Sequence, residues 1–120
     1  MQYTILIYQT AEDMAHSNDP DPARAAVYAQ EWPRYAKALK DAGVLVEGIG
    51  LQPPAMATRV SFPGGKELVQ DGPYADTKEQ LGGFIVIDVP DLDTALSWVA
   101  RIPRLENRVF EVRPNKVLPS

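Results

Sequence analysis

The sequence predicts an α+β fold, an antiparallel sheet with helices on one face, and three observations lead to it. Segments rich in β-branched and aromatic residues alternate with two segments whose apolar residues recur every three or four positions. Their order is strand, helix, strand, short hairpin, strand, helix, strand, and ferredoxin-like βαββαβ topology with an extra hairpin is the simplest match. The 120 residues hold no repeat and no linker, so we expect a single domain over residues 1–120.

Composition excludes several classes of function. Apolar residues make up 45% and charged residues 23%, as in ordinary soluble proteins. The net charge of −4 offers no basic surface, so no direct nucleic-acid partner is expected. The absence of cysteine excludes disulfides, a thiol nucleophile and thiolate metal sites. With neither a signal peptide nor an apolar run of membrane-spanning length, we expect a cytoplasmic protein without a membrane partner.

The first half of the chain predicts a central strand and a long helix. Gln2–Gln9 is apolar at both alternating sets of positions, which favours a central strand. The helix at Ala23–Ala42 has one apolar stripe, formed by Tyr28, Trp32, Tyr35, Leu39 and Ala42. Pro33 predicts a kink or a fresh start near Trp32, and Gly43 ends the helix.

The second half predicts a hairpin, a second helix and the remaining strands. A helix at Leu92–Ile102 begins after Asp91, a suitable N-cap, and ends before Pro103. The other strands are expected at Val44–Leu51, Thr58–Phe62, Lys66–Gln70, Phe84–Val89 and Arg108–Arg113. Both helices would cover one face of the sheet. An apolar face left exposed on the other side predicts a homodimer in which two sheets face each other.

The loop Thr10–Pro22 contains the only histidine, His16. Asp13, Asp19 and Asp21 lie nearby, so a metal site is one interpretation. The spacing matches no known metal-binding loop, and we therefore expect a solvated loop with neither metal nor cofactor.

The stretch Asp71–Gly83, DGPYADTKEQLGG, combines turn residues with charged residues. Asp71, Asp76, Lys78 and Glu79 could meet if the loop folds back, and a carboxylate beside an ammonium group can transfer protons. Asp71, Lys78 and Glu79 are the candidate catalytic residues. The alternative interpretation is structural: Asp71 caps a turn, and Lys78 and Glu79 are solvated or ion-paired.

This stretch, with Phe84, resembles the signature of the DGPF (DGPFAETKE) group of YCII-related proteins, with Tyr74 in place of the usual Phe and Asp76 in place of Glu. The resemblance extends along essentially the whole chain, through the segments Tyr3–Tyr8, Ala42–Leu45, Gly50–Pro54, Asp91–Asp93, Trp98–Ala100 and Glu111–Pro114. It implies a bacterial protein that forms a dimeric α+β barrel. The biochemical role of the group is largely unassigned, and its genes often lie beside those of extracytoplasmic-function sigma factors.

The resemblance also bears on catalysis. In the wider superfamily, a His on the first helix and an Asp after the second form a catalytic dyad in a cleft. The matching positions here are Trp32 and Ile102, and neither side chain transfers a proton. Whether the chain is an enzyme is therefore left open.

Three functions follow as hypotheses. The first is a dimer that binds a small molecule in a cleft near the motif, with Trp32, Tyr35, Asp71, Tyr74 and Lys78 as ligand-binding residues. The second is a lyase or isomerase that uses a carboxylate–lysine pair from the motif for acid/base catalysis. The third is an interaction module for a sigma factor, which only the family resemblance suggests.

Overall fold

The computed structural model describes residues 1–10, 21–72, 79–103 and 108–117. Within the first helix, it describes no side chain for residues 24, 25, 27 and 28. Of the residues singled out above, the loop around His16 and the motif positions 73–78 therefore lie outside the described residues.

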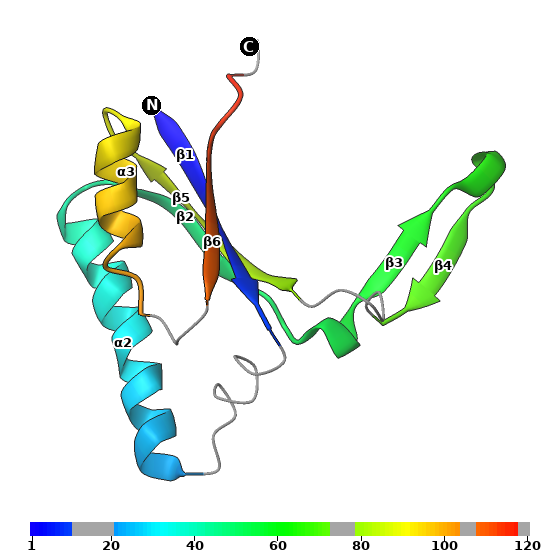
Figure 1. Ribbon diagram of the computed structural model, residues 1–120, viewed down its shortest axis with the longest axis horizontal. Coiled ribbons are helices and arrows are strands. Elements are labelled where there is room, and N and C mark those ends of the chain that lie inside the picture. Colours follow the sequence, from blue (N-terminus) through cyan, green and yellow to red (C-terminus); the bar gives the residue numbers. More distant parts are fainter. Residues whose placement is uncertain (11–20, 73–78, 104–107, 118–120) are drawn as a thin grey trace.

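The body of the protein is a four-stranded sheet in which every neighbouring pair is antiparallel (Figure 1). Its order is β2-β5-β1-β6, with bounds Leu45–Gly50 (β2), Gln80–Asp88 (β5), Gln2–Gln9 (β1) and Val109–Pro114 (β6). β1 is central, as its apolar character on both faces predicts. The split βαβ order confirms the α+β fold of ferredoxin-like topology.

The first helix, α2 (Pro22–Asp41), has Asp21 as its N-cap, and Asp21 Oδ1 accepts a hydrogen bond from the Ala23 backbone N–H at 2.9 Å. α2 continues through Pro33 as one helix, so the fresh start expected near Trp32 is not observed. Packing explains this continuity, because apolar residues on both sides of Pro33 lie against the sheet and tertiary packing supplies most helix stability.

The second helix, α3 (Leu92–Val99), has the predicted N-cap: Asp91 Oδ1 accepts from the Thr94 backbone N–H at 2.8 Å. It ends three residues earlier than predicted. The reason is a tighter final turn, in which the N–H groups of Arg101 and Ile102 donate to carbonyl groups three residues back, those of Trp98 and Val99.

Both helices pack on one face of the sheet (Figure 1). The core contains alternate residues of the central strands and the apolar stripes of both helices: Tyr3, Ile5, Ile7, Tyr35, Leu39, Ile85, Ile87, Val89, Ala95 and Ile102. The Tyr35 hydroxyl donates to the Trp98 carbonyl at 2.8 Å and thereby joins α2 to α3.

The opposite face of the sheet, here called the open face, carries neither of the two described helices (Figure 1). Cross-strand pairing places Leu6 opposite Phe84 and Ile49 opposite the same Phe84, so these apolar side chains share that face. Thr4 and Val86 form the next pair on this face. The apolar patch is flanked by charged residues of the edge strands, because Glu111 pairs with Leu6 and Glu47 pairs with Val86. The expected uncovered face is therefore present, with apolar residues at its centre.

The predicted hairpin is a separate two-stranded sheet, here called the arm, formed by β3 (Thr58–Ser61) and β4 (Leu68–Asp71). Two 3₁₀ turns flank β3, η1 (Pro54–Met56) and η2 (Pro63–Gly65). In η2, Gly64 and Gly65 have φ of 62° and 82°, which lets the chain reverse. Figure 1 shows the arm extending away from the sheet, on the side opposite the helices.

The strand after the motif differs from the prediction. β5 begins at Gln80 rather than Phe84, so the last four residues of the motif belong to the sheet. A bulge explains the difference: Ile7 pairs with Gly83 and Tyr8 with Leu81, which leaves Gly82 as the extra residue.

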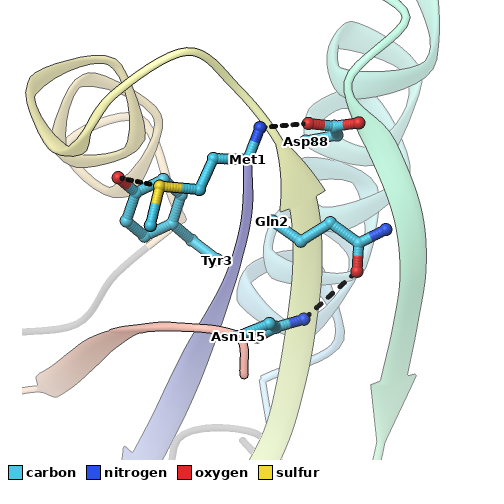
Figure 2. Close-up of polar contacts among 5 residues, drawn as sticks. All are labelled: Met1, Gln2, Tyr3, Asp88 and Asn115. Carbon is cyan, nitrogen blue, oxygen red and sulfur yellow. Dashed lines mark hydrogen bonds and ion pairs between the residues drawn. The ribbon is translucent and has the colours of Figure 1, made fainter. Parts of the chain in front are cut away.

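Polar contacts join the two ends of the chain to the sheet (Figure 2). The Met1 amino group lies 2.9 Å from Asp88 Oδ1, and the Tyr3 hydroxyl donates to the Met1 sulfur at 3.4 Å. The Asn115 side-chain N–H donates to Gln2 Oε1 at 3.3 Å. Because the Met1–Asp88 pair is exposed, it adds little stability.

Candidate ligand pocket

A cleft of about 740 Å³ lies between α2 and the β2–β5 side of the sheet. Its walls come from three places: strands β1, β2 and β5, the residue that follows β2, and the face of α2 that is turned toward the sheet. Its residues are Ile7, Gln9, Trp32, Pro33, Tyr35, Ala36, Leu39, Lys40, Leu45, Gly48, Ile49, Gly50, Leu51, Gly82, Gly83, Phe84 and Ile85. The volume and the apolar character are those of small-molecule sites.

The floor of the cleft is a patch of sheet without side chains. Gly48 pairs with the buried Ile85, and Gly50 pairs with Gly83, so the two β2 glycines occupy helix-facing positions. A Cβ added at Gly48 or Gly50 would meet nothing within 4 Å. The cleft therefore exists because glycines stand where core side chains would otherwise fill the space.

Gly83 has a different role. A Cβ added there would lie 2.5 Å from the Ile49 backbone oxygen. Only glycine therefore lets β2 and β5 approach each other this closely, as the Gly82-Gly83 pair suggests from sequence.

The roof of the cleft is aromatic. The Trp32 and Tyr35 rings meet edge to face, with centroids 6.3 Å apart and planes at 89°. Tyr35 is only 5% exposed. Burial raises the pKa of Tyr35 to about 12, although the positive charge of Arg101 lowers it in part. The phenol therefore stays protonated at neutral pH and serves as a hydrogen-bond donor.

Two polar side chains line the cleft beside this apolar surface. Gln9 follows Ile7 on the helix-facing side of β1, and its side chain occupies the space that a Cβ at Gly82 would need. Lys40 lies in the last turn of α2 and is the only charged side chain among the lining residues. Among the described residues, Lys37 forms an ion pair with Asp41 at 2.7 Å, whereas no carboxylate lies within ion-pair distance of Lys40.

The structure brings together some of the residues expected to bind a ligand. Trp32 and Tyr35 line the same cleft. Asp71 lies apart from it, exposed at the end of β4 opposite Thr58, and Glu79 is exposed just before β5. Tyr74 and Lys78 lie outside the described residues.

Sequence reasoning missed Gln9, Lys40, Gly48 and Gly50. Two glycines at alternate positions in a predicted strand were the available signal, because a strand glycine often marks the close approach of a ligand or backbone.

The two positions that match the superfamily dyad are not in one cleft. Ile102 is 2% exposed and lines a separate cleft of about 440 Å³ with Glu31, Arg34 and Arg101. This cleft shares only Tyr35 with the one that contains Trp32. The arrangement gives no acid–base pair at these positions.

Across the described segments, no three His, Cys, Asp or Glu side chains gather in a way that could hold a metal ion. No helix in these segments has the length and apolar character needed to cross a bilayer.

Comparison with known proteins identifies a family and a relative. A family model described as a YCII-related domain matches residues 1–118. An uncharacterized protein of Rhizobium meliloti (strain 1021) is 38% identical over 76 residues, which cover 62% of this chain and 61% of that protein. The chain therefore aligns with less than two thirds of the length of this relative.

Proposed function

Because the chain belongs to the family of YCII-related domains, and its curated relative is uncharacterized, we propose a function from the geometry of the cleft. The protein binds a small, largely apolar molecule that carries one negative charge. The observation that supports this most strongly is the glycine floor under an aromatic roof, with a single charged side chain, Lys40, among the lining residues.

The apolar part of the ligand lies between the floor and the roof. Gly48 and Gly50 leave a flat strip of backbone, and Trp32 and Tyr35 present ring edges and faces above it. Flat apolar molecules fit such a space and gain from its desolvated aromatic walls.

The charged part of the ligand lies toward Lys40. Lys37, one turn earlier, is neutralised by Asp41 at 2.7 Å, and Lys40 has no such partner among the described residues. Lys40 is exposed where it lines the cleft, and its ammonium group is suited to a carboxylate or sulfonate whose apolar part lies inside the cleft. The Gln9 amide adds a donor and an acceptor at the same cleft.

Acid/base catalysis has weaker support. Among the described lining residues, only Lys40 and Tyr35 have side chains that can titrate, and burial keeps the proton of Tyr35 in place at neutral pH. Of the motif residues that suggested an enzyme, the described ones, Asp71 and Glu79, are exposed and outside the cleft. No observation on the described residues favours a sigma-factor partner.

The same proposal includes a homodimer. The open face presents Leu6, Phe84 and Ile49 in adjacent cross-strand pairs, with no helix over them. A sheet face of this kind is commonly buried in an interface.

The experiment uses two dyes of nearly the same shape, 8-anilinonaphthalene-1-sulfonate and its uncharged analogue N-phenyl-1-naphthylamine. Gly48→Val fills the floor of the cleft, at a backbone position that accepts a side chain. We expect this variant to lose binding of both dyes while its free energy of unfolding stays equal or rises, because filling a cavity stabilises.

Charge is tested separately. Lys40→Gln should weaken binding of the sulfonate about 3- to 10-fold and leave the uncharged dye unaffected, since one charge-assisted contact contributes roughly 1 kcal/mol. Lys37→Gln is the matched control, on the same helix but outside the cleft, and should change neither affinity. Dye binding that survives Gly48→Val would place the binding elsewhere and refute the proposed site.

A further inference from the structure

The arm has one apolar face. In its ladder, Val60 pairs with Val69, and Phe62 lies two residues beyond Val60 on the same side. These three side chains are 52%, 55% and 64% exposed. Here they are called the arm face. The opposite side of the ladder carries Arg59, Ser61, Leu68 and Gln70, and the pair Thr58–Asp71 lies at the base of the arm-face side. Leu68 is thus the one large apolar side chain of the ladder outside the arm face, and no described helix or strand of the four-stranded sheet packs extensively against the arm.

Such an arm is not stable by itself. An isolated two-stranded hairpin is marginal in water, and three strands or packing against another element are needed. Each arm strand has only four residues. A short exposed ladder with an apolar face therefore calls for a surface against which it packs.

The size of the exposed surface matches what a homodimer interface would bury. The chain exposes 8512 Å², whereas a compact monomer of its 13.2 kDa mass exposes about 6,400 Å², an excess of about 2,100 Å². The radius of gyration, 16.5 Å, also exceeds the value of about 13.5 Å for a compact chain of this length. Two copies that each bury such an excess form an interface of about 4,000 Å², within the range of obligate homodimers.

We propose that the arm is an intersubunit clasp, and that the arm face of each protomer packs on a second copy of this chain. The surface it meets is the open face of the partner sheet, where Leu6 and Phe84 form the corresponding apolar patch. A two-fold axis then buries both arms and both open faces in one continuous interface. The clasp does not depend on the ligand proposed above, although it extends the proposed dimer.

The test measures the dissociation constant by sedimentation velocity over a range of protein concentrations. Val60→Thr combined with Val69→Thr keeps β-branched residues in the ladder but removes apolar contact. We expect wild type to sediment at twice the 13.2 kDa chain mass, and the double variant to dissociate at concentrations at least about tenfold higher. Ser61→Thr combined with Gln70→Thr, on the opposite side of the ladder, is the matched control and should match wild type.

A second variant distinguishes loss of the interface from misfolding of the ladder. Phe62→Ser lies beyond the last residue of β3 and leaves the cross-strand pairs intact, so it should weaken the dimer without altering far-ultraviolet circular dichroism. If the wild-type protein stays monomeric up to about 100 μM, both the clasp and the dimer are refuted. A dimer whose dissociation constant is the same in all arm-face variants overturns the clasp alone, and the dye experiment is unaffected by either result.

Discussion

Tyr35→Phe should reduce stability at neutral pH by an amount that follows from one hydrogen bond. The Tyr35 hydroxyl donates to the Trp98 carbonyl at 2.8 Å, and its side chain is 5% exposed. A net hydrogen bond contributes about 0.5–1.5 kcal/mol, and a carbonyl left unsatisfied adds to the loss. We therefore expect the free energy of unfolding to fall by about 1–2 kcal/mol at pH 7, while the ring and its contact with Trp32 remain.

The same substitution should have a different effect in alkali. The pKa of Tyr35 rises from 10.0 to about 12 on folding. Folding thus retains a proton that the unfolded chain releases, and wild type loses stability as pH rises from about 10 to 12. At pH 11 this loss is about 1.4 kcal/mol. Phenylalanine has no proton to lose, so at pH 11 the difference between wild type and variant should nearly vanish.

The assay is urea unfolding at pH 7, 9 and 11, followed by circular dichroism at one fixed protein concentration, because the stability of a dimer depends on concentration. Tyr3→Phe is a useful control: its hydroxyl contacts only the Met1 sulfur at 3.4 Å among the described residues. A Tyr35→Phe difference that is the same at pH 7 and pH 11 would refute the argument from burial. A difference below about 0.5 kcal/mol at pH 7 would refute the argument from the hydrogen bond.

Two further predictions concern the body of the fold. Leu39→Ala removes a side chain that is 1% exposed between α2 and the sheet, and should cost about 2–5 kcal/mol in urea unfolding; a cost below 1 kcal/mol would mean that α2 does not pack as described. Asp91→Ala removes the N-cap of α3 and should lower the melting temperature at pH 7. Hydrogen bonds from Thr94 lower the pKa of Asp91, so its contribution is present above the unfolded pKa and is lost as pH falls through the folded value. The melting temperatures of wild type and Asp91→Ala should therefore converge at acidic pH, and a gap that persists at pH 2 would contradict the capping role.

The sheet was well predicted from the sequence because its strands are rich in β-branched residues and carry apolar residues at alternating positions. Ile5 and Ile7 point to the helices, and Leu6 points to the open face, as a central strand requires. The N-cap at Asp91 was predictable for a similar reason, because capping depends on local chemistry. Local patterns of this kind survive folding because packing reinforces them.

The cleft could be predicted only in part. Trp32 and Tyr35 were identifiable from helical spacing, but the space beneath them depends on a bulge at Gly82 and on glycines at 48 and 50. Bulges shift a strand by one residue and leave no clear mark in a single sequence. From the sequence, Lys40 looks like an ordinary lysine that complements the negative C-terminal end of a helix. Only the structure shows that the neighbouring Lys37 is paired with Asp41 and that Lys40 lines the cleft.

The place of β1 in the sheet has a consequence for how the chain folds. Its two neighbours, β5 and β6, begin 78 and 107 residues after its own first residue, as their bounds Gln80 and Val109 show. During synthesis, the apolar N-terminal strand therefore remains without a partner until most of the chain has left the ribosome. Pairing between such distant segments slows folding and leaves hydrophobic strands exposed to aggregation in the meantime. β6 completes the four-stranded sheet, so a chain truncated before residue 109 would retain both helices but would lack the strand that pairs with one edge of β1.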